Sequence, residues 1–343
     1  MNEKSSKNRI LTGMRPTCPL HLGHYVGALE NWIKLQDKYD CYFLIADYQA
    51  LGDYADNVSR IRDSVVQVVL DWLSVGLDPK KSTFVVQSYV PEYAELAMLL
   101  SMITPLGLVQ GNPTLKNEML KLSDVSIGFF NYPVSQVADI LLNRANLVPV
   151  GEDQLPHIEL TREIARKFNR LYGEVFPIPE ALVGRIPRLV GTDGQAKMSK
   201  SLGNCVYLSD SQETVVSKVG KMFTDPTRAK ISDPGHIEGN VVFSYLEVFH
   251  RDRVALDALK RRYKEGGVGD VEVKSILSKE LNDFLDPIRE RRDYFISHPD
   301  MVNKAIVEGS KKASLIAKST MDKVRKAMNI VGYEDLRNIR DIV

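Results

Sequence analysis

Two imidazole side chains lie close together near the start of the chain, in the segment His21-Leu22-Gly23-His24. The segment follows a short apolar run and opens a helical pattern. A helix N-terminus offers unpaired N–H groups and a positive dipole end, both of which suit a phosphate. Gly23 would let a nucleotide approach the backbone, and imidazoles three residues apart share one side of a helical turn. The segment indicates a nucleotide phosphate site; in an ordinary loop it would be an incidental histidine pair.

A second candidate group is Lys197-Met198-Ser199-Lys200-Ser201, which lies in a glycine-rich connector. Two lysines on a flexible loop can close over a polyphosphate and neutralise charge as it develops. Taken alone, a K-x-x-K pattern is more often a solvated basic loop. The chain contains neither G-x-x-x-x-G-K-[ST] nor G-x-G-x-x-G. Nucleotide binding must therefore use the histidine pair and this lysine loop.

The elements that position these groups alternate between strand and helix. Strands are predicted at 10–14, 42–46 and 83–87, and helices at 22–39, 56–76 and 153–172. This alternation predicts βαβ units, and hence an α/β fold with a Rossmann-like, doubly wound parallel sheet. Helical patterns continue to the end of the chain. We expect a catalytic domain at 1–185, a connector loop at 186–210 and an all-helical C-terminal region at 211–343.

Composition excludes several classes of protein. The 343 residues carry a net charge of +1, which argues against a non-specific grip on nucleic acid, and hence against a DNA-binding protein. Three scattered cysteines (Cys18, Cys41 and Cys205) disfavour a disulfide framework or a cysteine metal site, and no metal ligands are predicted. No apolar run is long enough to span a membrane, and Met1–Arg9 lacks the apolar core of a signal peptide. We expect a cytoplasmic protein with no membrane partner.

Taken together and in this order, the two groups resemble the HIGH and KMSKS motifs of class I aminoacyl-tRNA synthetases. The resemblance extends to several further segments and looks like a tryptophanyl-tRNA synthetase of a divergent bacterial type, with the tyrosyl enzyme as the nearest rival. It is dense from 10 to 210 and thinner beyond. The segments that carry it are Arg15-Pro16-Thr17, Asp47-Tyr48-Gln49-Ala50, Gln87-Ser88, Tyr132–Ile140, Val148–Gln154 and Asp193-Gly194.

The resemblance implies a two-step reaction. The carboxylate of L-tryptophan attacks the α-phosphorus of ATP and pyrophosphate leaves; the aminoacyl group then passes to the 3′-terminal ribose of tRNA(Trp). Mg²⁺ would bridge the phosphates. The catalytic residues would be His21, His24, Lys197 and Lys200. The residues that bind ATP would be Arg15, Gly23, His24, Lys116, Gly151, Asp153, Lys197, Met198, Ser199 and Lys200. Lys116 is equally well explained as a surface lysine.

The resemblance also implies a tryptophan pocket formed by Gln49, Tyr132, Gln136, Asp139, Val148, Val150 and Gln154. Asp139 is the expected specificity residue, because indole offers one N–H donor and an ionised carboxylate only accepts. A site of that kind rejects phenylalanine, which would leave the carboxylate unpaired. The alternative is an aspartate that caps a helix or lies on its surface.

Four positions depart from the commoner family pattern: Arg15, Cys18-Pro19, Gln49 and Gln136. They bear on substrate affinity and on the boundary between tryptophan and tyrosine. Alternatives to a tryptophanyl enzyme are a tyrosyl enzyme, a nucleotidyltransferase with a His-x-Gly-His site, and a non-catalytic paralogue that only binds. The basic stretch 304–326, with seven basic and two acidic residues, suits tRNA. The family also implies a homodimer.

Overall fold

The computed structural model describes residues 8–120, 122–183, 189–195, 198–199, 202–224, 228 and 230–330. Within them a five-stranded parallel sheet has the order β3-β2-β1-β4-β5. The strands are β1 (Arg9–Met14), β2 (Asp40–Ile45), β3 (Ser82–Val86), β4 (Leu147–Val150) and β5 (Glu180–Val183). The strand order reverses between β1 and β4, which confirms the predicted doubly wound sheet. Ligands bind outside the carboxyl ends of the strands at such a reversal.

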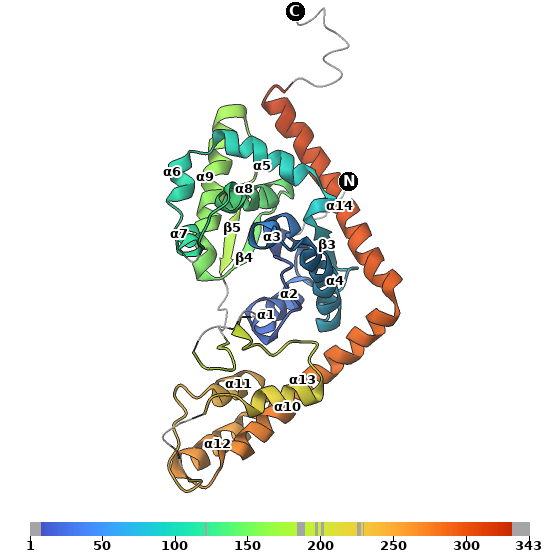
Figure 1. Cartoon of the computed structure of the whole chain (residues 1–343). Coiled ribbons are helices and arrows are strands. Elements are labelled where there is room, and N and C mark those ends of the chain that lie inside the picture. Colours follow the sequence, from blue (N-terminus) through green and yellow to red (C-terminus); the bar gives the residue numbers. More distant parts are fainter. Residues whose placement is uncertain are drawn as a thin grey trace, which may run out of the picture.

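Helices cover both faces of the sheet (Figure 1). The N-terminal half contains α1 (Leu22–His24), the π-helical turn η1 (Tyr25–Leu29), α2 (Glu30–Leu35), α3 (Asp47–Tyr54), α4 (Val58–Val75), η2 (Gln87–Tyr89), α5 (Glu92–Ile103), α6 (Leu106–Gln110), α7 (Pro113–Met119), α8 (Ile127–Leu142), η3 (Glu152–Gln154) and α9 (Leu155–Tyr172).

Successive side chains of a strand point to opposite faces of the sheet, which explains the two layers of helices. Phe43 and Ile45 of β2 pack with α2 and α4, whereas Tyr42 and Leu44 face α5, α8 and α9. Because both faces are covered, β2 and β3 are almost continuously buried, as parallel strands usually are.

The predicted elements agree with the structure in type, with two differences. The region 22–39, predicted as one helix, is divided into α1, η1 and α2 and ends at Leu35. Residues 180–183, predicted as part of a loop-rich connector, form β5 instead. This edge strand is short and follows two prolines, so its local sequence shows no strand pattern. Only its pairing with β4 in the folded chain defines it as a strand.

The remaining helices are α10 (Gln212–Gly220), α11 (Val241–Phe249), α12 (Arg253–Glu265), α13 (Asp270–Ser297) and α14 (Pro299–Ala327). Figure 1 shows α10 to α13 at one end of the molecule and α14 running back beside the sheet. There α14 lies against the edge strand β3: a Cβ on Gly309 would come within 2.1 Å of the carbonyl oxygen of Phe84. The hydroxyl of Ser310 accepts a hydrogen bond from the Val86 N–H at 3.1 Å. The helix thus covers a sheet edge that would otherwise be open.

Candidate active site

A cavity of about 380 Å³ opens at the carboxyl ends of β1 and β4, where the strand order reverses. Gly13 and Met14 line it from the end of β1, and η1, α2, α3 and α8 supply further walls. Many of the residues predicted for the ATP and tryptophan sites meet in this one cavity. They are Arg15, His24, Gln49, Tyr132, Gln136, Asp139, Val148, Val150, Gly151 and Gln154.

The histidine pair lies at the N-terminus of α1, next to this cavity. His21 is the N-cap residue, and its ring stacks on that of His24 with centroids 3.8 Å apart. The His21 N–H donates to Nδ1 of His24 at 3.2 Å, which places the proton of a neutral His24 on Nε2. Burial, and then the neighbouring His24, lower the pKa of His21 to about 3. His21 is therefore neutral at physiological pH, and His24 faces the cavity.

The loop that carries the second motif packs directly on this turn. Leu22 N–H donates to the carbonyl of Val206 at 2.9 Å, and Gly23 N–H lies 3.3 Å from the sulfur of Met198. Ser199 N–H donates to Oδ1 of Asn204 at 2.7 Å, and Asn204 in turn donates to Asp193. Met198 and Ser199 are thus held beside the histidine pair rather than in the cavity lining. Lys197 and Lys200 lie outside the described residues.

Asp139 of α8 is buried at the inner end of the cavity, where it is 2% exposed. Gln49 Nε2 donates to its Oδ2 and Gln87 Nε2 to its Oδ1, both at 2.7 Å. Burial raises the pKa of Asp139 to about 8, and the Asp47 carboxylate acts in the same direction. The two amide hydrogen bonds oppose that rise because they stabilise the ionised form. The carboxyl group is therefore mostly neutral at pH 7 and becomes an acceptor-only carboxylate as the pH rises through about 8. It faces a cavity lined by apolar side chains and by polar ones such as Gln136 and Gln154.

Arg15 and Tyr132 form a polar wall of the same cavity. The Tyr132 hydroxyl lies 3.2 Å from Nε2 of His157, and the Arg15 guanidinium lies 5.9 Å from the centroid of the tyrosine ring. Arg15 also forms an ion pair with Asp53 at 2.9 Å. Burial raises the pKa of Tyr132 and lowers that of His157, so both groups are neutral at pH 7. Arg15 is the cation of this wall.

Comparison with known proteins identifies the family. Residues 3–286 match the model of the family described as tRNA synthetases class I (W and Y). The chain belongs to these class I synthetases. It is 48% identical to the tryptophan–tRNA ligase of Streptococcus pyogenes, over 95% of this chain and 99% of that one. It is 45% identical to the tryptophan–tRNA ligase of Chlamydia caviae, over 95% and 97% respectively.

A solved structure has the same fold as this class I synthetase. It is the tryptophanyl-tRNA synthetase of Campylobacter jejuni complexed with ADP and tryptophan, with a TM-score of 0.85 and 34% identity. The alignment covers 94% of this chain and 100% of that one. A tyrosyl-tRNA synthetase from Archaeoglobus fulgidus also matches, with a TM-score of 0.65, but at 23% identity it is evidence for the fold alone.

Lys116 and Asp153, which are also predicted for ATP binding in this synthetase, do not line the cavity. Lys116 is exposed on α7. The backbone carbonyl of Asp153 in η3 accepts a hydrogen bond from the Thr114 hydroxyl at 2.9 Å. Gly151 and Gln154, on either side of Asp153, do line the cavity. Gly23 lies on the histidine turn instead. The ATP contacts of these residues stay predictions.

The structure adds residues to which sequence reasoning gave no role. Gln87 bonds Asp139, His157 holds the Tyr132 hydroxyl, and Glu118 lines the cavity. The position of Gln87, directly after a buried strand, was the available signal, since strand ends converge on the site. His157 and Glu118 lie on helices, where periodicity alone does not distinguish a site residue from a surface residue.

Proposed function

We propose that this class I synthetase activates L-tryptophan with ATP and transfers it to the 3′ end of tRNA(Trp), with release of AMP and pyrophosphate. The observation that carries the proposal is Asp139, a buried carboxyl group whose two oxygens accept from glutamine amides, in the cavity at the strand-order reversal. Indole has one donor and no acceptor, so it pairs with this carboxylate. The tryptophan–tRNA ligase relatives, 45% and 48% identical over almost the whole chain, support the same amino acid.

The other cavity residues receive roles that fit their chemistry. Val148 and Val150 would contact the flat apolar face of the indole. Tyr132, Gln136 and Gln154 would bind the α-amino and carboxylate groups, and Gln49 would hold Asp139 from the cavity side. A tyrosine hydroxyl could also donate its proton to this carboxylate, but its oxygen would need a donor, which indole does not require.

ATP would lie between the cavity and the histidine turn. His21, Gly23 and His24 would bind its phosphates at the start of α1, with Arg15, Gly151, Met198 and Ser199 around the nucleotide. The tryptophan carboxylate attacks the α-phosphorus, and the bond to pyrophosphate breaks. Such chemistry depends mostly on positioning and charge stabilisation, the role that we assign to Lys197 and Lys200.

Mg²⁺ would accompany the ATP phosphates. The described part of the chain contains no group of three or more His, Cys, Asp or Glu side chains arranged to hold a metal. In the proposal the phosphate oxygens of ATP bind the ion.

For tRNA we propose contacts on α10 to α13 and on the exposed lysines of α14. Lys304, Lys311 and Lys318 are exposed, and a spacing of seven residues places them along one face of that helix. Phosphates would be the partners of such a row. We place this reaction in the cytoplasm, where the buried thiols of Cys18, Cys41 and Cys205 would stay reduced. Within the described residues, no helix is long and apolar enough to cross a membrane.

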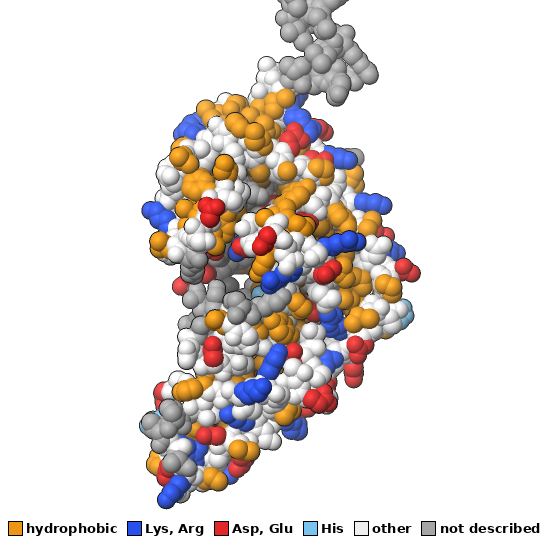
Figure 2. Space-filling model, viewed as in Figure 1, with side chains coloured by type: hydrophobic (Ala, Val, Ile, Leu, Met, Phe, Trp, Pro, Cys, Tyr) orange, Lys and Arg blue, Asp and Glu red, His pale blue; other side chains and the backbone are white. Residues whose placement is uncertain are grey.

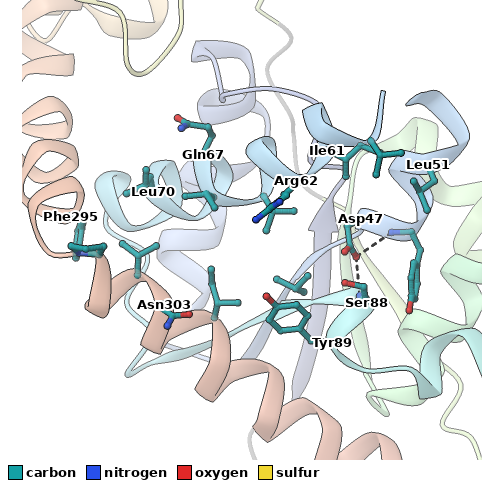
Figure 3. Close-up of a pocket in the computed structure, with 18 of the residues that line it drawn as sticks. Asp47, Leu51, Ile61, Arg62, Gln67, Leu70, Ser88, Tyr89, Phe295 and Asn303 are labelled. Carbon is teal, nitrogen blue, oxygen red and sulfur yellow. Dashed lines mark hydrogen bonds between the residues drawn. The ribbon is translucent and has the colours of Figure 1, made fainter. Parts of the chain in front are cut away.

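A homodimer is part of the proposal. An apolar hollow of about 840 Å³ lies between α3, α4, η2 and the start of α14 (Figure 3). Val58, Val66 and Tyr89 are exposed along it. Hydrophobic side chains also gather on the outer surface of this half of the molecule (Figure 2). An exposed apolar surface of this kind is typical of a subunit interface.

Aminoacylation of a tRNA(Trp) transcript tests the whole proposal. The full chain, with ATP and labelled tryptophan, should form acid-precipitable tryptophanyl-tRNA. A tRNA(Tyr) transcript with labelled tyrosine should not be charged. Charging of tRNA(Tyr) instead would identify a tyrosyl enzyme, and charging of neither would favour a paralogue that only binds.

A further inference from the structure

Gln87 lies behind Asp139, on the side away from the cavity. It is fully buried and does not line the cavity, yet its amide donates to Oδ1 of Asp139 at 2.7 Å. We infer that Gln87 is a positioning residue that orients Asp139 and favours its ionised form, and so sets the pH above which the site prefers a side chain with an indole N–H. This inference rests on the proposed function, because it concerns how the same carboxylate recognises its substrate.

The backbone around Gln87 holds its amide in place. The residue begins η2 directly after β3, and its carbonyl accepts from Val90 N–H at 3.1 Å. The next residue, Ser88, donates its N–H to Oδ1 of Asp47 at 2.9 Å (Figure 3). Asp47 begins α3, the helix that carries Gln49. The two amides that bond Asp139 therefore come from elements that are tied to each other.

Few other described groups stabilise the ionised form of Asp139. Asp47 of α3 faces Asp139 with the same charge, and Tyr93 of α5 is a titratable neighbour that stays neutral. Among the described groups that act on Asp139, none is a cation. The N–H groups of Gln87 and Gln49 are what oppose the cost of burying the charge. Each oxygen keeps a second lone pair for a further donor.

The side chain of Gln87 donates to Asp139 but leaves its own amide oxygen unpaired among the described residues. Its Oε1 is buried and has no hydrogen-bond partner among the described residues. A side chain chosen only for packing at this position would be apolar, since an unpaired buried acceptor is unfavourable. Its retained amide points to the bond with Asp139 as its purpose. Replacement by methionine removes the unpaired acceptor too, so the Gln87→Met chain should still fold.

The test compares two substrates that differ in the N–H alone. Amino-acid-dependent ATP–pyrophosphate exchange is measured with tryptophan and with β-(benzothienyl)alanine, in which sulfur replaces the indole N–H, between about pH 6 and pH 10. The ratio of their kcat/KM values cancels the titration of the α-amino group and of the ATP site. In the wild-type protein this ratio should rise as Asp139 ionises and then level off. A flat ratio would overturn the inference.

In Gln87→Met the rise should move to a pH about one unit higher, because one hydrogen bond to the ionised form is lost. In the nearly isosteric Gln87→Glu it should move further in the same direction, since a second carboxylate repels the first. Gln36→Met is the matched control: this buried glutamine bonds two backbone groups, the carbonyl of Gly76 and the N–H of Asp78, and does not line the cavity. Its ratio should follow the wild-type curve.

The outcomes separate the inference from the proposed function. A wild-type chain that shows no tryptophan-dependent exchange at any pH would contradict the proposed function itself. Exchange with tryptophan, together with an unshifted ratio in both folded Gln87 variants, would contradict only the role of Gln87. An equal shift in Gln36→Met would show a general effect of losing a buried amide, and would also overturn the inference.

Discussion

The side chain of Asp139 is almost completely buried, and both of its oxygens accept hydrogen bonds from glutamine amides. A substrate without a hydrogen-bond donor binds poorly beside such a carboxylate, because the buried charge then lacks a hydrogen bond. Selectivity built on an unpaired polar group is much stronger than selectivity built on apolar fit. The proposed selectivity therefore depends on Asp139 and on the two amides that bond it.

Asp139→Asn keeps the shape of the side chain but replaces one acceptor oxygen with a donor. At about pH 9, where Asp139 is mostly ionised, we expect kcat/KM for tryptophan in ATP–pyrophosphate exchange to fall about 10- to 100-fold, the value of one hydrogen bond to a charged group. The KM for ATP should stay unchanged, because we place Asp139 at the end of the cavity that binds the amino acid. Asp37→Asn, at a surface aspartate paired with Lys81, makes the same change of charge and should have no effect. Wild-type tryptophan kinetics in Asp139→Asn would remove it from the site.

Some helices and strands can be predicted from the local sequence, and others cannot. The buried strands β2 and β3 and the amphipathic α4, closed by Gly76 in the left-handed conformation, follow from local pattern, and so does the meeting of cavity residues at strand ends. The strand β5 and the course of α14 do not, because both are set by distant partners. Gln87 belongs to the same class: its place after a strand is visible, but the direction of its amide depends on the packing of α8.

Two elements from different halves of the chain meet at a buried ion pair. Asp71 of α4 is fully buried, and its Oδ2 accepts from the Leu20 N–H at 2.7 Å, one residue before the histidine pair. Its Oδ1 lies 3.7 Å from Nε of Arg292 on α13, which also donates to Gln67. Burial raises the pKa of Asp71 to about 6, while Arg292 and the Leu20 N–H act against it. This carboxylate connects the C-terminal helices to the histidine turn.

Arg292→Met should make stability depend more steeply on pH. Because the folded pKa of Asp71 is above the unfolded value of 3.8, ionising this group costs stability as the pH rises through about 4 to 6. Without Arg292 that cost grows, so the variant should be about 3 kcal/mol less stable than the wild type at pH 8 and closer to it at pH 5.

Chemical denaturation of both chains at the two pH values measures this difference. Arg291→Met is the control, since the exposed Arg291 donates to the carbonyl of Ser74 and has no buried carboxylate beside it. Its effect should be the same at both pH values. A pH-independent loss in Arg292→Met would argue that Arg292 acts through packing rather than through Asp71.

The C-terminal helices connect the far end of the molecule to the sheet. The helices α10 to α13 extend away from the sheet, and α14 returns along β3 to its far edge (Figure 1). Through α13 the distant helices contact α4, and through Asp71 they reach the turn before His21. A tRNA bound at the far end would thus be mechanically connected to the place where we propose that ATP reacts.

Activation of tryptophan is tested by ATP–pyrophosphate exchange of the purified full chain without tRNA, with tryptophan and tyrosine side by side. We expect exchange that depends on tryptophan and is absent with tyrosine, because Asp139 would accept the indole N–H and indole needs no donor in return. Exchange driven by tyrosine, or no exchange with either amino acid, would contradict the proposed activity.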